Sequence, residues 1–273
     1  MGANSIFINM IEILQYGFIQ NAFLGGVMIA LVCALIGVFL VPRRLSLLGD
    51  GIAHIAFGGI ALGILFGINP IISAVIVALI FAFFIDKLIT TKNIYADSLI
   101  AVFLSLGVGL GLIIISLKGG FNKDLFSYLF GSILTLSAND LILIAFLSIF
   151  TLAFFIYNYR SLLLITLNQD IAKTKGIKIG LINLGFMLCT AVAVVIGIRA
   201  VGIVLISALI VIPYLSASRI SNSLINSTIL ASIIAVISVF IGIIASFYFN
   251  LPTGATIVVF LCMVFLSTLI SRK

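Results

Sequence analysis

Long apolar runs, separated by short polar or glycine-containing stretches, occupy almost the whole chain. A helix needs about 20 apolar residues to cross the hydrocarbon core of a membrane. Charged and turn-forming residues mark where each run ends. The pattern predicts helices at 18–41, 45–68, 70–90, 96–117, 139–159, 180–198, 200–216, 224–248 and 254–270. The run at 200–216 is short and ends near Pro213, so it fits either a half-helix or a tight helical return.

Composition supports a membrane location for these helices. Of the 273 residues, 64% are hydrophobic and 8% are charged, which is more apolar surface than a soluble domain can bury. The predicted fold is therefore all-α, a polytopic transmembrane bundle of about eight or nine spans. No proline- or serine-rich linker divides the chain, so residues 1–273 are expected to form one domain.

Basic residues indicate how the bundle is oriented. The net charge of +7 comes from residues scattered singly between apolar runs, a pattern that does not favour nucleic-acid binding. An excess of basic residues normally marks the cytoplasmic side. If the N-terminus lies outside, eleven basic residues fall on that side: Arg43, Arg44, Lys87, Lys92, Arg160, Lys173, Lys175, Lys178, Arg219, Arg272 and Lys273. Only Lys118, Lys123 and Arg199 then fall outside.

Several nucleotide and catalytic motifs are missing from the sequence. It contains no GxxxxGK[ST] run, no HExxH and no GxSxG. The chain is therefore not expected to be an enzyme or to hold a permanent cofactor. A transport function would need energy from a second subunit or from an ion gradient.

The strongest candidate for chemistry is a pair of residues in the predicted helix 45–68. Asp50 and His54, the only histidine of the chain, are four residues apart and so share one helix face. A carboxylate and a neutral imidazole suit zinc and tolerate manganese or iron. Two protein ligands are few for a permanent site but suit a transported ion, with water or the same pair of a second copy filling the remaining positions. The pair could instead hydrogen-bond to each other and brace the bundle.

Four further residues have both a packing and a gating interpretation. Gly59 and Gly63 follow the pair at a spacing that lets helices approach closely, and packing is the simpler interpretation. Arg199 lies near the outer end of a span, where such a side chain normally reaches toward the interface. Pro213 falls at a helix break near the cytoplasmic face, where a local kink accounts for it.

Two segments between spans are more than simple turns. Residues 168–180, NQDIAKTKGIKIG, predict a short cytoplasmic helix, with Asp170 in its first turn and Gly176 at its end. Residues 118–140 mix glycine, charge and aromatic residues, and predict an external loop with an interfacial or re-entrant stretch.

Five sequence runs together resemble the metal-type ABC transporter permeases, which take up zinc, manganese or iron. They are RRLSLLGDGIAHIAFGGIALG at 43–63, DLFSYLFGSIL at 124–134, NQDIAKTKGIKIG at 168–180, VGIVLISALIVIPYLSASRIS at 201–221 and LPTGATIVV at 251–259. The resemblance implies a homodimer in the bacterial cytoplasmic membrane, driven by a cytoplasmic ABC ATPase and supplied by an extracytoplasmic metal-binding protein. It also implies that Asp50 and His54 contact the transported metal. The segment with Asp170, Ala172 and Gly176 would dock on the ATPase.

The identity of the metal is less well defined by the sequence. GDGIAHIAFGG and LPTGATIVV resemble the bacterial high-affinity zinc uptake permeases most closely. Ser105 and Ser132 depart from that pattern, since zinc relatives can carry a histidine and an acidic residue there. Zinc is the first expectation for the substrate, and manganese or iron is the alternative. A gradient-driven cation transporter, an intramembrane enzyme and a structural scaffold are alternatives from other classes.

Overall fold

The computed structural model describes residues 17–92, 95–117, 129, 131, 136–203 and 205–271, and in these ranges every regular element is a helix. The ten helices are α2 (Gly17–Leu40), α3 (Leu48–Phe66), α4 (Pro70–Lys92), α5 (Ala96–Leu117), α7 (Ala138–Leu167), α8 (Gln169–Thr174), α9 (Ile179–Val201), α10 (Ile206–Ile220), α11 (Leu224–Phe249) and α12 (Thr253–Ser271). Eight of them are long and apolar enough to cross a membrane, and α8 and α10 are shorter. The predicted fold class, a polytopic helical bundle, is confirmed.

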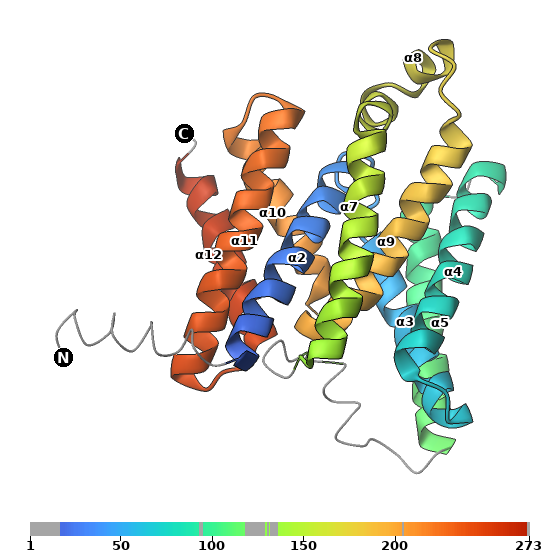
Figure 1. Ribbon diagram of the computed structural model, residues 1–273. Helices are drawn as coiled ribbons and strands as arrows, with labels where there is room; N and C mark the ends of the chain where they lie inside the picture. Colours follow the sequence, from blue (N-terminus) through green and yellow to red (C-terminus); the bar gives the residue numbers. More distant parts are fainter. Residues whose placement is uncertain are drawn as a thin grey trace.

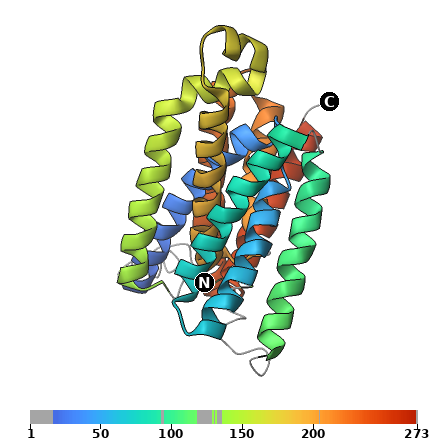
Figure 2. The same ribbon diagram turned by 90° about the vertical axis from the view of Figure 1, so that its right-hand side faces the viewer.

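The helices form one elongated bundle with two distinct edges. α11 and α12 lie at one edge, α3, α4 and α5 lie at the other, and α2, α7, α9 and α10 lie between them (Figure 1). α5 is the most peripheral of these helices and packs chiefly against α3. The short helix α8 projects beyond one end of the bundle in both views (Figures 1 and 2).

Local sequence signals explain where several helices begin and end. Ser137 and Asp140 form a reciprocal capping box at the start of α7, and Ser223 caps α11 through the N–H of Asn226. α3 ends at Gly67, whose φ of 69° is a left-handed conformation that favours glycine. Asn250 adopts the same conformation at the end of α11.

Most predicted helix ranges agree with the structure within a few residues, and two do not. α7 continues past the predicted end at 159 to Leu167, since the stretch after Arg160 is apolar and lacks glycine or proline. The run predicted at 200–216 is displaced, because Gly202 ends α9 and a new helix starts only at Ile206. Pro213 therefore lies inside α10, which continues to Ile220, and not at its end.

The turn between α9 and α10 lies inside the bundle. Val201, Ile203 and Ile206 are at most 1% exposed. Gly197 of α9 faces both Ile206 and Ile29, and Ile29 lies halfway along α2. With 15 residues α10 is about 22 Å long, shorter than the hydrocarbon core. α10 is therefore a half-helix that begins within the bundle, one of the two forms that the sequence predicts.

Helix order places both α8 and the end of α12 at the same end of the bundle (Figure 2). The described basic residues of the α2–α3 turn and of the α8 segment lie there, and Arg199 lies near the opposite end of α9. This arrangement agrees with the orientation predicted from charge. Most of the predicted external loop at 118–140, and with it Ser132, lies outside the described residues.

Candidate metal site

The structure places Asp50 in the first turn of α3 and His54 one turn further on. Both side chains are half-buried. Within the described residues neither side chain makes a hydrogen bond or an ion pair, and the two do not bond to each other. The two groups interact only electrostatically, so the bracing alternative has no hydrogen bond or ion pair to support it among the described residues.

α3 packs against four helices, α4, α5, α9 and α10. Gly51 faces Ile100 of α5, Gly59 faces Ala74 of α4, and Gly49 faces Ser207 in the first turn of α10. At about 100° per residue, Asp50 and His54 point between the α5 side and the α10 side. The pair thus lies between the α5 and α10 sides of α3, away from the contact with α4.

Close packing of α3 against α5 fixes the position of the His54 backbone. A Cβ atom added to Gly107 of α5 would lie 2.6 Å from the carbonyl oxygen of His54 and 2.8 Å from the Cα of Ile55. One turn further along α5, a Cβ added to Gly111 would lie 2.7 Å from the ring of Phe57. Glycine is required at these positions because α5 approaches the backbone of α3 directly.

Gly59 and Gly63 serve an equivalent contact on a neighbouring side of α3. Added Cβ atoms would lie 2.8 Å from the Cα of Ala74 and 2.8 Å from the Cα of Pro70, both on α4. In this conformation the two glycines pack α3 against α4, and neither is close to the face that carries Asp50.

Arg199 does not extend freely toward solvent. Its Nη2 atom lies 2.9 Å from Oδ2 of Asp140, so an ion pair joins the last turn of α9 to the first turn of α7. The sequence analysis missed Asp140, although the Ser137-x-x-Asp140 spacing is a recognisable capping signal. Pro213 is buried in α10, about one turn after Ile210, which borders Gly49.

The segment predicted to dock on an ATPase forms the short helix α8. Asp170 lies in its first turn, and Asn168 caps it by accepting hydrogen bonds from the N–H groups of Asp170 and Ile171. Ala172 is fully buried against the bundle, whereas Ile171 is 49% exposed. Gly176 follows the helix with φ 73°, and its N–H donates to the carbonyl of Lys173. α8 is thus anchored on one side and presents an apolar side chain on the other.

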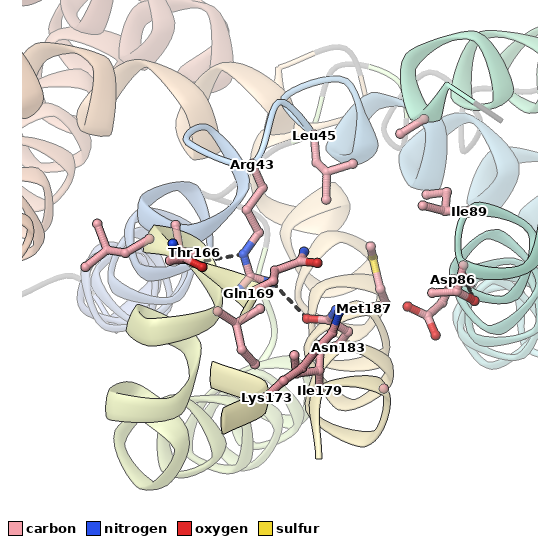
Figure 3. Close-up of a pocket in the computed structure, with 16 residues that line it drawn as sticks. Arg43, Leu45, Asp86, Ile89, Thr166, Gln169, Lys173, Ile179, Asn183 and Met187 are labelled. Atoms are coloured by element: carbon pink, nitrogen blue, oxygen red, sulfur yellow. Dashed lines mark hydrogen bonds between the residues drawn. The ribbon is translucent and has the colours of Figure 1, made fainter. Parts of the chain in front are cut away.

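A cavity of about 780 Å³ with both polar and apolar walls lies beside α8. Its walls come from the end of α7, the start of α9, and from α4, which contributes Asp86 (Figure 3). Arg43, in the turn between α2 and α3, reaches into this region between Thr166 and Asn183 (Figure 3). Sequence reasoning used Arg43 only as an orientation marker, although it opens the 43–63 motif.

Arg43 is the most extensively bonded cation in the described part of the chain. Nε donates to Oγ1 of Thr166 at 2.8 Å, Nη1 to Oδ1 of Asn183 at 3.0 Å, and Nη2 to the carbonyl of Leu162 at 3.1 Å. The guanidinium also lies 5.0 Å from the centre of the Phe186 ring. Burial lowers the pKa of Arg43 to about 10, so the side chain stays protonated at neutral pH.

Comparison with known proteins defines the family. A profile described as the ABC 3 transport family matches residues 15–272, nearly the whole chain. The chain belongs to the ABC 3 transport family. The resemblance to metal-type ABC permeases that five sequence runs indicate is therefore confirmed.

The relatives of this chain include transport proteins named for two different metals. The chain is 31% identical to the manganese transport system membrane protein MntC of Halalkalibacterium halodurans, over 90% of this chain and 85% of that protein. It is also 31% identical to the high-affinity zinc uptake system membrane protein ZnuB of Buchnera aphidicola subsp. Schizaphis graminum, over 94% of this chain and 99% of that protein.

A solved structure supports the fold. The structure described as PsaBC from Streptococcus pneumoniae in complex with Fab matches with a TM-score of 0.85 and 26% identity, covering 96% of this chain and 95% of that one.

Proposed function

We propose that this chain is the membrane-spanning permease of an ATP-driven importer that carries a divalent transition metal, zinc in first place, into the bacterial cytoplasm. One observation carries the proposal. A carboxylate and an imidazole lie one turn apart on a membrane-spanning helix, half-buried and with no hydrogen bond or ion pair to another described side chain. Ionisable groups inside a membrane are costly and mark ion paths.

The donor set suits a cargo ion rather than a resident one. The described residues hold no group of three or more histidine, cysteine or acidic side chains that could bind a metal. Asp50 and His54 supply two ligands of borderline softness, which favours zinc, manganese or iron over calcium or magnesium. A site with few protein ligands binds an ion weakly enough to release it.

A second copy of the chain would complete the site. The Asp50–His54 face of α3 lies between its contacts with α5 and α10, and both side chains are only half-buried. A two-fold axis beside this face would bring two carboxylates and two imidazoles together, the four ligands of a tetrahedral zinc site. The homodimer and the site at its axis are therefore parts of the same proposal.

The helix α8 is the proposed docking element for the ATPase. It lies beyond the end of the bundle and presents Ile171 outward while Ala172 anchors it. A cytoplasmic ATPase that closes on ATP would push on α8 and shift the helices as rigid bodies. A metal-binding protein on the opposite side would deliver the ion.

Zinc stands first because GDGIAHIAFGG and LPTGATIVV resemble zinc permeases most closely. Manganese is the alternative, since a manganese relative is as similar to the chain as a zinc relative is.

The test uses vesicles that contain the permease with its ATPase and its binding protein. Labelled zinc and manganese are supplied separately and in competition. We expect ATP-dependent zinc uptake that Asp50→Asn and His54→Ala abolish while both variants still insert. Asp97→Asn is the matched control, because Asp97 is an exposed carboxylate in the first turn of α5.

Three results would change the proposal. Normal uptake by both site variants would remove the pair from the ion path. A preference for manganese would keep the transporter class and replace the metal. Uptake that needs no ATP would favour a gradient-driven carrier.

A further inference from the structure

We propose that Arg43 is the positioning residue that passes the movement of α8 to α3, the helix that carries Asp50 and His54. This inference rests on the proposed function, because it assigns a residue to the coupling between ATP hydrolysis and transport. Arg43 itself lies outside the metal site and outside α8.

The first step concerns the two helices that flank α8. α7 ends at Leu167, just before α8, and α9 starts at Ile179, just after it. Arg43 bonds to the last turns of α7 through Thr166 and the carbonyl of Leu162, and to the second turn of α9 through Asn183. One guanidinium thus joins both flanks, and a displacement of α8 that moves either flank changes the geometry at Arg43.

The second step concerns how firmly Arg43 is held. Its guanidinium lies over Phe186, which is fully buried. Phe186 packs against Phe39 of α2 and Phe155 of α7, with ring centres 6.5 and 5.7 Å apart. Interiors packed in this way transmit displacement rather than absorb it. The aromatic contact therefore stiffens the attachment of Arg43 to α2, α7 and α9 together.

The third step concerns the turn that leads from Arg43 to α3. Leu45 is buried, and its N–H donates to the carbonyl of Leu40 at 3.1 Å. The N–H of Leu48, the first residue of α3, donates to the carbonyl of Leu45 at 2.9 Å. The turn is thus hydrogen-bonded at both ends, and a shift of Arg43 is carried to the first turn of α3, where Asp50 lies.

The cavity supplies the room that such a shift needs. About 780 Å³ of open space lies beside the guanidinium, and Asp86 and Met187 line its other walls (Figure 3). The guanidinium makes three hydrogen bonds on one side and faces open space on the other. It can therefore move together with its hydrogen-bond partners into that space.

Arginine chemistry makes the assignment testable. The guanidinium donates in three fixed directions in one plane, whereas a lysine ammonium cannot reproduce that fork. Arg43→Lys keeps the charge and loses the geometry, and Arg43→Gln loses both. Arg44→Gln is the matched control, since Arg44 is the adjacent residue and its side chain is exposed.

The experiment uses the complete complex with ATPase and binding protein in vesicles, with zinc and manganese as probes. Metal ions moved per ATP hydrolysed, basal ATP hydrolysis, metal binding by the permease and melting temperature are measured for each variant. For both Arg43 variants we expect the transport ratio to fall roughly tenfold, which corresponds to one charge-assisted hydrogen bond. Basal hydrolysis and metal binding are expected to stay near the wild-type values, and Arg44→Gln to behave as wild type. The melting temperature of the Arg43 variants is expected to fall by a few degrees, because the hydrogen bonds to Thr166 and Asn183 are lost.

Asn183→Leu and Thr166→Val test the same pathway if the Arg43 variants do not fold. Each should lower the transport ratio, and Asn183→Leu combined with Arg43→Gln should lower it no further than Arg43→Gln alone. An unchanged ratio in the Arg43 variants, full rescue by lysine, or additive losses in the double variant would overturn the inference. A wild-type complex that transports no metal would instead overturn the proposed function.

Discussion

Gly107→Ala tests how strictly the α3–α5 contact positions His54. The added Cβ would lie 2.6 Å from the carbonyl oxygen of His54, about 0.8 Å short of the 3.4 Å at which ordinary contact begins. The obstructing atoms belong to the backbone of α3, so no side chain can rotate away. The variant can fold only if α3 and α5 move apart.

The size of the effect follows from two opposing contributions. Forcing an extra carbon into a packed contact costs about 1–3 kcal/mol. Replacing glycine by alanine inside a helix stabilises the folded protein by up to about 1 kcal/mol. Gly109→Ala is the control, since it makes the same change in the same helix with no atom within 4 Å of the added Cβ. The two variants should therefore differ by about 1–3 kcal/mol, with Gly107→Ala the less stable.

Thermal unfolding of the purified protein and metal uptake in vesicles measure the two consequences. At about 2–4 °C per kcal/mol, the melting temperature of Gly107→Ala should fall several degrees below that of Gly109→Ala. Metal binding should weaken as well, because ligand distances must hold within about 0.2 Å. Equal melting temperatures together with wild-type uptake for Gly107→Ala would refute the reasoning, since α3 would then not be fixed by this contact.

Two further variants test other parts of the structure. Gly176→Pro should abolish transport-linked ATP hydrolysis while metal binding remains. Proline cannot adopt a φ of 73° and lacks the N–H that donates to the carbonyl of Lys173. Full coupling, measured as metal moved per ATP hydrolysed, would contradict the docking role of α8. Arg199→Gln should lower the free energy of unfolding by no more than about 1 kcal/mol, because the ion pair with Asp140 is partly exposed. A larger loss in thermal unfolding would show that the pair contributes more than a partly exposed contact normally does.

The sequence predicted the helices well because each long span is set by its own apolar run. The Asp50–His54 spacing and the ends of α8 were also predictable, since both depend on neighbours a few residues apart. Whether these residues act in transport stays a prediction. The bonds of Arg43 to α7 and α9 were not predictable, because they join residues more than 100 positions apart in the chain. Likewise, periodicity cannot show that Gly107 faces the backbone of His54.

The predicted range of the half-helix α10 was wrong for a physical reason as well. Residues 200–206 are apolar and give no polar signal of a turn, since the turn is buried among other helices and not at the surface. Gly202 was the one available signal, and its φ of 90° shows that the backbone there needs glycine.

The start of α10 also bears on how easily this region can rearrange. The first N–H groups of any helix lack partners within the helix, and Leu205 offers no side-chain cap to α10. In water such groups are solvated, but here the helix begins at the buried Ile206. Opening this turn therefore breaks fewer hydrogen bonds within the helix than opening a turn in the middle of a helix does. The start of α10, beside Gly49, is thus expected to open more easily than the middle of a helix, and it lies next to the helix that carries Asp50 and His54. Hydrogen exchange should be faster there than in the middle of α2.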